Sequence, residues 1–266
     1  MPECSPDAFA MAGRTETPMN VVAVLQHTAG EYLGLMEDHL EGRRIRFQYF
    51  RPFAGGKAKL PGPDLPADAL ILLGGGPWGS AGTRDLPTLA EEIAITRAML
   101  AEGTPVIGIG LGAQILAIAA GGSSEPADFR FECTTATRVV HDALNGYLPE
   151  TFSQVVYMRD RPVLPDAARV LAVDEGGSAA VFEVGDNAYG FLGNPGIKLG
   201  MVEDLIMEFE EVPEGAARRL DELRALQPEI EDDLVPIMTG LVQCTGLMSS
   251  PKAAAKAPKS LDETVI

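Results

Sequence analysis

The sequence predicts an α/β protein whose doubly wound, mostly parallel sheet is flanked by helices. Short, continuously apolar runs of β-forming residues recur along the first half of the chain, which is typical of strands buried on both faces. Helical apolar periodicity separates these runs, and glycine-rich turns follow two of them, at 74–76 and 108–112. Because open sheets of this kind bind ligands outside the carboxyl ends of their strands, both turns mark that edge.

The first half of the chain alternates strand and helix patterns. Strand patterns cover 21–25, 45–50, 69–73 and 106–109, and helical spacing covers 31–40, 87–100 and 113–120. Pro87 suits the first turn of its helix, and Glu91 and Glu92 lie early, where the helix dipole favours acidic residues. The resulting order, β-α-β-β-α-β-α, favours a parallel sheet.

The sequence pattern changes after Gly122. Shorter β patterns at 129–140, 155–158, 170–173, 179–184 and 189–192 indicate antiparallel additions to the same domain. Helical patterns follow at 198–211, 214–226 and 229–247, with Pro213 and Pro228 as breakers. We therefore expect a flexible arm over 1–19, the main domain over 20–211, a helical extension over 212–248 and a disordered Ala/Pro/Lys tail over 249–266.

Composition limits the partners of the protein. The chain has 21 Lys and Arg residues against 38 Asp and Glu residues, and its net charge of −17 repels nucleic-acid phosphates and anionic membranes. An early acid, the lack of an apolar leader and the lack of any membrane-length apolar run indicate a cytoplasmic protein. Because Cys4, Cys133 and Cys244 lack disulfide or metal-ligand spacing, we expect neither a metal nor a cofactor.

The segment Thr104–Gln114 is the most informative stretch of the sequence. A strand pattern passes through Gly108-Ile109-Gly110-Leu111-Gly112 directly into a helix. In such a strand–turn–helix elbow, the residue at the tip lies in a tight turn at the edge of the sheet. A nucleophile at this position has an exposed side chain with backbone N–H groups beside it. The tip here is Gly110, which has no side chain.

Three segments of the chain resemble the signature blocks of class I glutamine amidotransferases, and in particular the stand-alone glutaminase domains similar to GMP synthase. The resemblance runs from about Val21 to about Glu211. It implies a flavodoxin-like sheet of the class I amidotransferase type. The segments that carry it are Leu73–Pro77, Pro105–Gln114 and Tyr189–Gly196, with support from Leu25-Gln26-His27 and Val163-Leu164-Pro165.

The resemblance also implies a Cys–His–Glu triad, and the sequence departs from it at all three positions. In the family the cysteine attacks the carboxamide of glutamine, the histidine transfers protons and the glutamate orients the histidine. Gly110 stands at the position of the cysteine, and Asn194-Pro195-Gly196 replaces the His-Pro-Glu triplet. Because removal of such a triad lowers turnover on the order of 10⁶-fold, we expect no glutamine hydrolysis by the usual route.

Other side chains are weaker candidates for catalysis or binding. Cys133 falls in a β segment and Cys244 in a terminal helical region, so neither lies at an elbow. His27 follows the first strand at the ligand edge, whereas His39 and His141 lie away from the expected block. Arg159, in the run Tyr157-Met158-Arg159-Asp160, either serves an anionic ligand or partner or is an ordinary solvated arginine.

A backbone cradle remains where the triad is missing. We define it as Gly74, Gly75, Gly76, Leu111 and Gln114. In the family, N–H groups of this loop and of the residue after the nucleophile form an oxyanion hole, which depends on backbone shape rather than on side chains. The resemblance therefore implies a site for a small amide, carboxylate or phosphate. The alternative is an inert site in which Gly110 only satisfies the tight turn.

These features favour a non-catalytic protein that acts as a scaffold or regulatory subunit, or that binds a small metabolite. The enzymatic alternative is an amidotransferase subunit that retains nitrogen transfer or another reaction through a non-standard site. The helical extension has an acidic face and an apolar series, which either dock on another protein or a second copy, or pack on the main domain. The acidic residues are Glu229, Glu231, Asp232 and Asp233, and the apolar residues are Leu234, Ile237, Met238 and Leu241.

Overall fold

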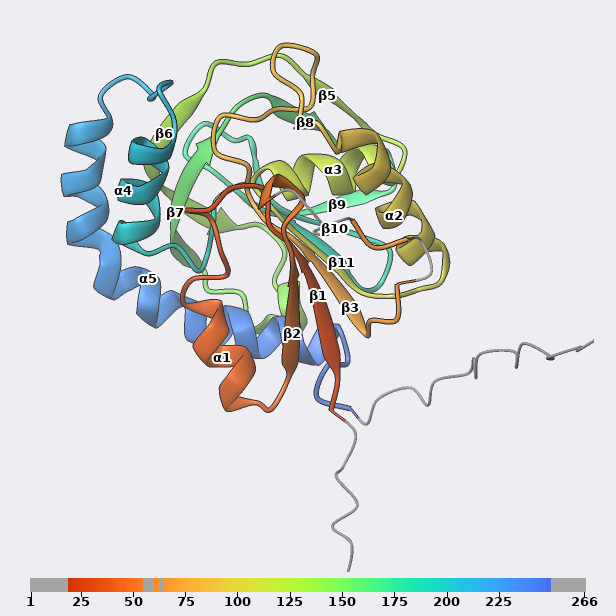
Figure 1. The fold of residues 1–266 in the computed structure, drawn as a ribbon. Helices are drawn as coiled ribbons and strands as arrows, with labels where there is room; N and C mark the ends of the chain where they lie inside the picture. Colours follow the sequence, from red (N-terminus) through yellow and green to blue (C-terminus); the bar gives the residue numbers. More distant parts are fainter. Residues whose placement is uncertain (1–18, 55–59, 63–64, 250–266) are drawn as a thin grey trace, which may run out of the picture.

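The computed structural model describes residues 19–54, 60–62 and 65–249. The predicted arm and tail, 1–19 and 249–266, lie almost entirely outside these residues. Within them, a nine-stranded sheet forms the centre of the molecule, in the order β2-β1-β3-β4-β11-β10-β9-β6-β7, and a second sheet pairs β5 with β8 (Figure 1). The strands are β1 (Val21–Leu25), β2 (Arg46–Phe50), β3 (Ala69–Leu72), β4 (Val106–Ile109), β5 (Ser123–Glu125), β6 (Arg130–Arg138), β7 (Thr151–Met158), β8 (Arg161–Val163), β9 (Ala168–Val173), β10 (Ala179–Val184) and β11 (Ala188–Phe191).

Helices cover both faces of the central sheet (Figure 1). Alternate residues of each buried strand point to opposite faces: Val22 and Val24 join one apolar cluster with α1 and α5, and Ala23 and Leu25 join another with α2 and α3. The α/β architecture with a mostly parallel sheet is therefore confirmed. The helices are α1 (Met36–Gly42), α2 (Leu89–Ala101), α3 (Leu111–Ala119), α4 (Leu199–Glu208) and α5 (Ala216–Cys244), with 3-10 turns η1 (Pro52–Ala54) and η2 (Ala143–Gly146).

The direction of β11 differs from the prediction. The pattern over 189–192 predicts an antiparallel addition, but β11 pairs in parallel with β4, with Tyr189 opposite Ile107. The antiparallel part of the sheet begins one strand later, at β10. The physical reason is the tight turn between β10 and β11, which makes these two strands antiparallel to each other and so turns β11 parallel to β4. This arrangement brings the end of β11 beside the elbow.

The helical patterns over 214–226 and 229–247 form one helix, α5, instead of two. The sequence predicts a break at Pro228, yet α5 continues through Pro228 and Pro236 to Cys244, and its ribbon bends along its length (Figure 1). An internal proline costs about 3 kcal/mol. Burial of α5 side chains such as Leu223, Ile230 and Leu234, at about 1.5–3 kcal/mol each, outweighs this cost. None of the described helices, α5 included, combines the length and apolar character that a bilayer span requires.

The apolar series of the helical extension packs on the main domain. Leu234, Ile237, Met238 and Leu241 are each 1% exposed and share a cluster with side chains of the sheet. On the acidic face, the carboxylate of Asp233 accepts a hydrogen bond from the backbone N–H of Ser153 on β7. Of the two sequence-based alternatives, the structure therefore shows packing on the main domain, and this apolar series is not available to a partner.

Candidate functional site

The elbow lies at the carboxyl end of β4, near the middle of the sheet. Gly110 has φ 54° and ψ −113°, a conformation that side-chain-bearing residues adopt only with strain. Its N–H donates to the carbonyl of Phe191 at 2.8 Å, which ties the turn to the end of β11. A Cβ placed on Gly110 lies 3.5 Å from its nearest neighbour, the Cα of Gly74, which is ordinary contact. The position of the missing nucleophile is buried but has room for a Cβ atom.

The glycine loop 74–76 forms the other wall of the site. A Cβ on Gly75 would lie 2.3 Å from Cδ2 of Leu111, so the loop and the start of α3 pack directly together. The carbonyl of Gly74 accepts a hydrogen bond from Nδ1 of His27 at 2.9 Å. Because a peptide unit is planar, this bond turns the N–H of Gly75 away from His27. Among the described residues, the N–H groups of Gly75 and Leu111 have no hydrogen-bond acceptor.

His27 links this loop to helix α2. It follows β1 and is buried, and its Nε2 lies 2.7 Å from Oε2 of Glu92 on α2. The other oxygen of Glu92 accepts a hydrogen bond from the hydroxyl of Thr88. Burial lowers the pKa of His27, but the Glu92 carboxylate, the carbonyl of Gly74 and the charge of Glu31 together outweigh burial, and the net pKa is raised. Because both ring nitrogens already face acceptors, His27 positions the loop and has no ring nitrogen free for a ligand.

Glu31 brings a carboxylate into the cradle. The helical pattern over 31–40 predicts a helix here, but α1 begins only at Met36, and Glu31 lies in the loop before it. Its Oε2 accepts a hydrogen bond from the N–H of Gly76 at 3.0 Å. Burial raises the pKa of Glu31 to about 7, while the N–H of Gly76 and the charge of His27 act in the opposite direction. A carboxylate with this pKa, in a site of this kind, is typical of functional positions.

The raised pKa of Glu31 makes stability depend on pH. Because the folded chain holds this proton more tightly than the unfolded chain, the contribution of Glu31 to the free energy of unfolding is fully present below pH 4.5 and is lost as pH rises through about 7. The whole difference is about 3 kcal/mol. The raised pKa of His27 acts in the same direction, since its contribution is present at low pH and lost as pH rises. In Glu31→Gln we expect this dependence to weaken in denaturant unfolding between pH 5 and 8.5.

A matched control for this experiment is Glu214→Gln, because Glu214 is exposed. This substitution is expected to leave the pH dependence of the unfolding free energy unchanged. Equal pH dependence in the native protein and in Glu31→Gln would show that Glu31 does not titrate in this range.

Of the other two degenerate triad positions, Asn194 lies next to Glu31, and Gly196 packs against Leu33 and Met36. Asn194 is 7% exposed, and its Oδ1 accepts a hydrogen bond from the N–H of Gly196 at 3.0 Å. Its amide faces Glu31 and lowers the pKa of that carboxyl, but Nδ2 has no hydrogen-bond partner in the described part of the chain. Gly196 is tightly enclosed, because a Cβ there would lie 2.7 Å from the carbonyl oxygen of Leu33 and 2.7 Å from Cγ of Met36. The position of the orienting glutamate is therefore closed.

Gln114 and Arg159 are both engaged in contacts within the chain. The amide of Gln114 donates to the carbonyl of Arg159 at 2.6 Å and accepts from the hydroxyl of Ser80. The guanidinium of Arg159 donates to the carbonyl of Pro77 at 3.0 Å and pairs with the carboxylate of Glu211. Neither side chain is free to contact a ligand unless these bonds open. They instead hold the rim of the cradle.

The remaining candidates lie away from the elbow. Cys133, on β6, is half-buried with its Sγ 3.8 Å from the carbonyl of Arg219, and burial raises its pKa to about 11. Burial also raises the pKa of Cys244 at the end of α5, so neither thiol is a ready nucleophile. His39 of α1 contacts Arg43, which follows the end of that helix, and His141 is exposed before η2.

Sequence reasoning missed two carboxylates of this region, Glu31 and Glu92. Both occur in segments with helical spacing, where an acidic residue predicts a solvated face. The available signal is position, because polar residues that follow a buried strand lie at the ligand edge of the sheet. That rule selects His27, which directly follows the first strand pattern. It also applies to Glu31, which lies four residues further along the chain.

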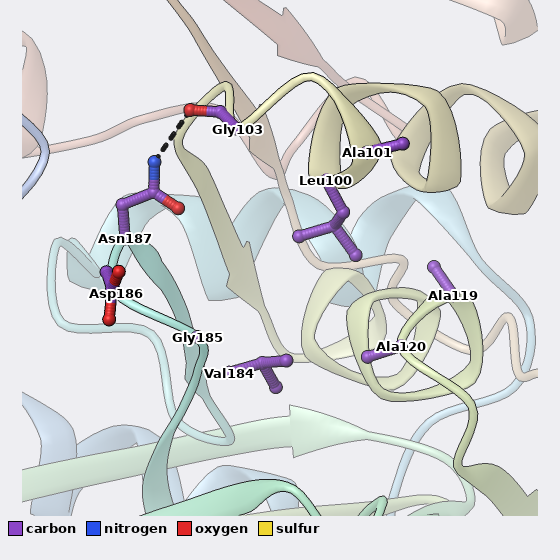
Figure 2. A pocket seen from close by; sticks show the side chains of 9 residues that line it. All are labelled: Leu100, Ala101, Gly103, Ala119, Ala120, Val184, Gly185, Asp186 and Asn187. Carbon is purple, nitrogen blue, oxygen red and sulfur yellow. Dashed lines mark hydrogen bonds between the residues drawn. The ribbon is translucent and has the colours of Figure 1, made fainter.

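A separate hollow of about 610 Å³ lies at the opposite edge of the sheet, beside the amino ends of β4 and β11. Figure 2 shows its lining, which includes Leu100, Ala119 and Val184, and the hydrogen bond from Asn187 to the carbonyl of Gly103 at 2.8 Å. Because the cradle lies at the carboxyl ends of the strands, this hollow is not part of the degenerate site.

The fold and the elbow define a doubly wound α/β protein of the glutaminase type. The family model for class I glutamine amidotransferases matches residues 58–191, about half of the sequence. The chain therefore belongs to the class I glutamine amidotransferase family.

Known relatives agree with this placement. The chain is 28% identical over 192 residues to YfeJ, a glutamine amidotransferase-like protein of Salmonella typhimurium, which covers 69% of this chain and 77% of that protein. It also resembles the structure of a glutamine amidotransferase from Methylobacillus flagellatus, with a TM-score of 0.72 and 21% identity over 85% of this chain and 96% of the other. A GMP synthase subunit from Thermoplasma acidophilum has a TM-score of 0.52 and 18% identity over 80% and 99%. The two structural matches support the fold.

Proposed function

We propose that this protein is a non-catalytic member of its family, located in the cytoplasm, that works by binding. Its cradle holds a small ligand through an amide, carboxylate or phosphate group, and the chain serves as a regulatory or scaffold subunit. The observation that carries the proposal is the contrast between two triad positions. The position of the nucleophile at Gly110 admits a Cβ atom, whereas the position of the orienting residue at Gly196 does not. A site of this shape can receive a ligand but cannot hold a triad.

The unpaired donors of the cradle support ligand binding over an inert site. The N–H of Leu111 lies at the start of α3, where the helix dipole favours an acceptor. Asn194 Nδ2 and the hydroxyl of Tyr157 are buried and have no partner among the described residues. Because buried polar groups are almost always hydrogen-bonded, these groups call for water or a ligand.

Replacement of Gly110 with leucine tests the proposal. The new side chain would project into the elbow between Gly110 and Gly74, so we expect the thermal shift produced by L-glutamine, L-glutamate or inorganic phosphate to disappear. Gly103→Leu is the matched control. Gly103 also has positive φ, 66°, but a Cβ there meets nothing within 4 Å, so this variant bears similar backbone strain and should keep the response. Absence of any response in the native protein would count against ligand binding.

Two observations support the subunit role: a structural neighbour and the surface beside the site. One structural neighbour is a GMP synthase subunit, which suggests assembly with a second protein. Met207 is 77% exposed and Val212 is 40% exposed. They flank the segment that contains Glu208, whose carboxylate accepts hydrogen bonds from the N–H groups of Ala29 and Gly30 in the loop before Glu31. Native mass spectrometry of the full chain with candidate synthetases tests this role, and a monomer in every mixture would argue against it.

Retained catalysis is the second candidate function, and Glu31 is the observation that favours it. A general base works best with a pKa near the working pH, and Glu31 has a pKa of about 7 in the cradle. A glutaminase assay with ammonia detection decides between the two. We expect no turnover above the protein-free background. Turnover that is lost in Glu31→Gln would favour an enzyme with a non-standard site.

A further inference from the structure

The carboxylate of Glu31 occupies the space left by the missing side chain of Gly74. A Cβ on Gly74 would lie only 1.8 Å from Oε1 of Glu31. The second oxygen, Oε2, is held by the N–H of Gly76 at 3.0 Å. Glu31 is 2% exposed, so the surrounding buried residues fix the position of its carboxylate. Because the Cβ position of Gly110 lies 3.5 Å from Cα of Gly74, a group bound beside these two glycines has Glu31 as a neighbour.

The negative charge of Glu31 is not matched by a cation. The charged and titratable groups that face it are His27 after β1, Glu208 on α4 and Tyr157 on β7. His27 shares its charge with Glu92, and Glu208 is itself acidic. Among the described residues, no lysine or arginine forms an ion pair with Glu31. In the described part of the chain, the N–H of Gly76 donates to Oε2 of Glu31, so Oε1 is the oxygen that can accept a hydrogen bond from a ligand in the cradle.

We propose that Glu31 is the specificity-determining residue of the cradle: its carboxylate accepts a hydrogen bond from an N–H group of the ligand. The cradle therefore takes an amide or an ammonium group and rejects carboxylates and phosphates. This inference rests on the proposed function and narrows its three ligand classes. A second anion beside a buried carboxylate lacks screening by water and is strongly repelled, whereas an N–H group supplies the missing donor. The carbonyl of an amide can in addition accept from Asn194 Nδ2, which is unpaired.

The test compares ligands of nearly the same shape. L-glutamine and L-glutamate differ only in a terminal amide against a carboxylate, L-ornithine supplies an ammonium group and inorganic phosphate supplies a second anion. Titration calorimetry at pH 8 is expected to show glutamine or ornithine bound at least about tenfold more tightly than glutamate and phosphate. In Glu31→Gln, which keeps an acceptor for Gly76, we expect this preference to fall to about threefold or less.

Two further variants keep the test decisive. Glu183→Gln changes a partly buried carboxylate on β10, beside Arg169, and should keep the native preference. Asn194→Asp keeps the oxygen that binds Gly196 and adds a second carboxylate, so it should weaken glutamate and phosphate further.

The outcomes separate this inference from the proposed function. Equal binding of glutamine and glutamate by the native protein, or a preference that survives Glu31→Gln, overturns the role of Glu31 and leaves ligand binding intact. Failure of all four probes to bind contradicts the proposed function, and the inference falls with it.

Discussion

Replacing His27 with alanine is expected to destabilise the protein by about 3–5 kcal/mol, as is typical when one partner of a buried ion pair is removed. Glu92 is fully buried, and without His27 it keeps only the hydroxyl of Thr88 as a hydrogen-bond donor. The carbonyl of Gly74 also loses its donor. Chemical denaturation at pH 7 measures the loss of unfolding free energy.

The double variant His27→Ala/Glu92→Ala separates this charge effect from lost packing. Removing both partners leaves no unpaired charge, so the double variant should cost less than the sum of the two single variants. His141→Ala is the control, since His141 is exposed, and should change the unfolding free energy by no more than about 0.5 kcal/mol. A loss below about 1 kcal/mol in His27→Ala would mean that the pair does not hold the loop.

The parallel half of the fold could be predicted because its strands are buried on both faces. Runs such as 69–73 and 106–109 are apolar at every position, and only a sheet covered by helices on both sides makes such strands. The elbow could be predicted because glycine spacing alone fixes a tight turn. Burial and pairing are local properties of these runs, so the sequence pattern is sufficient to predict the parallel strands and the elbow.

The remaining features depend on contacts that a linear pattern does not contain. The direction of β11 is set by its neighbours in the sheet, and the continuity of α5 through Pro228 is set by burial against the core. Glu31 and Glu92 are polar residues in helical patterns, and only the fold shows that both are buried. The sequence therefore identifies the missing triad more readily than the buried carboxylates of Glu31 and Glu92 near it.

Replacing Gly196 with glutamate, the residue type that the family has there, is expected to destabilise the protein by about 4 kcal/mol or more. The added Cβ would lie 2.7 Å from the carbonyl oxygen of Leu33 and from Cγ of Met36, and Gly34 packs on the other side, since a Cβ there would meet the carbonyl oxygen of Gly196 at 2.1 Å. The carboxylate would also be buried without a cation. A thermal melt and denaturant unfolding measure this loss.

Gly110→Cys is the matched comparison for Gly196→Glu. Its Cβ meets nothing closer than 3.5 Å, so its cost is the positive φ alone, about 1–3 kcal/mol. We expect this variant to fold, to expose a thiol that reacts with Ellman's reagent and to show no glutaminase activity. If Gly196→Glu proved as stable as Gly110→Cys, the packing around Gly196 would be able to open. In that case the triad would be missing only because three side chains have changed. The enclosed backbone at Gly196 instead indicates that the packing of α1 against the site excludes the orienting residue.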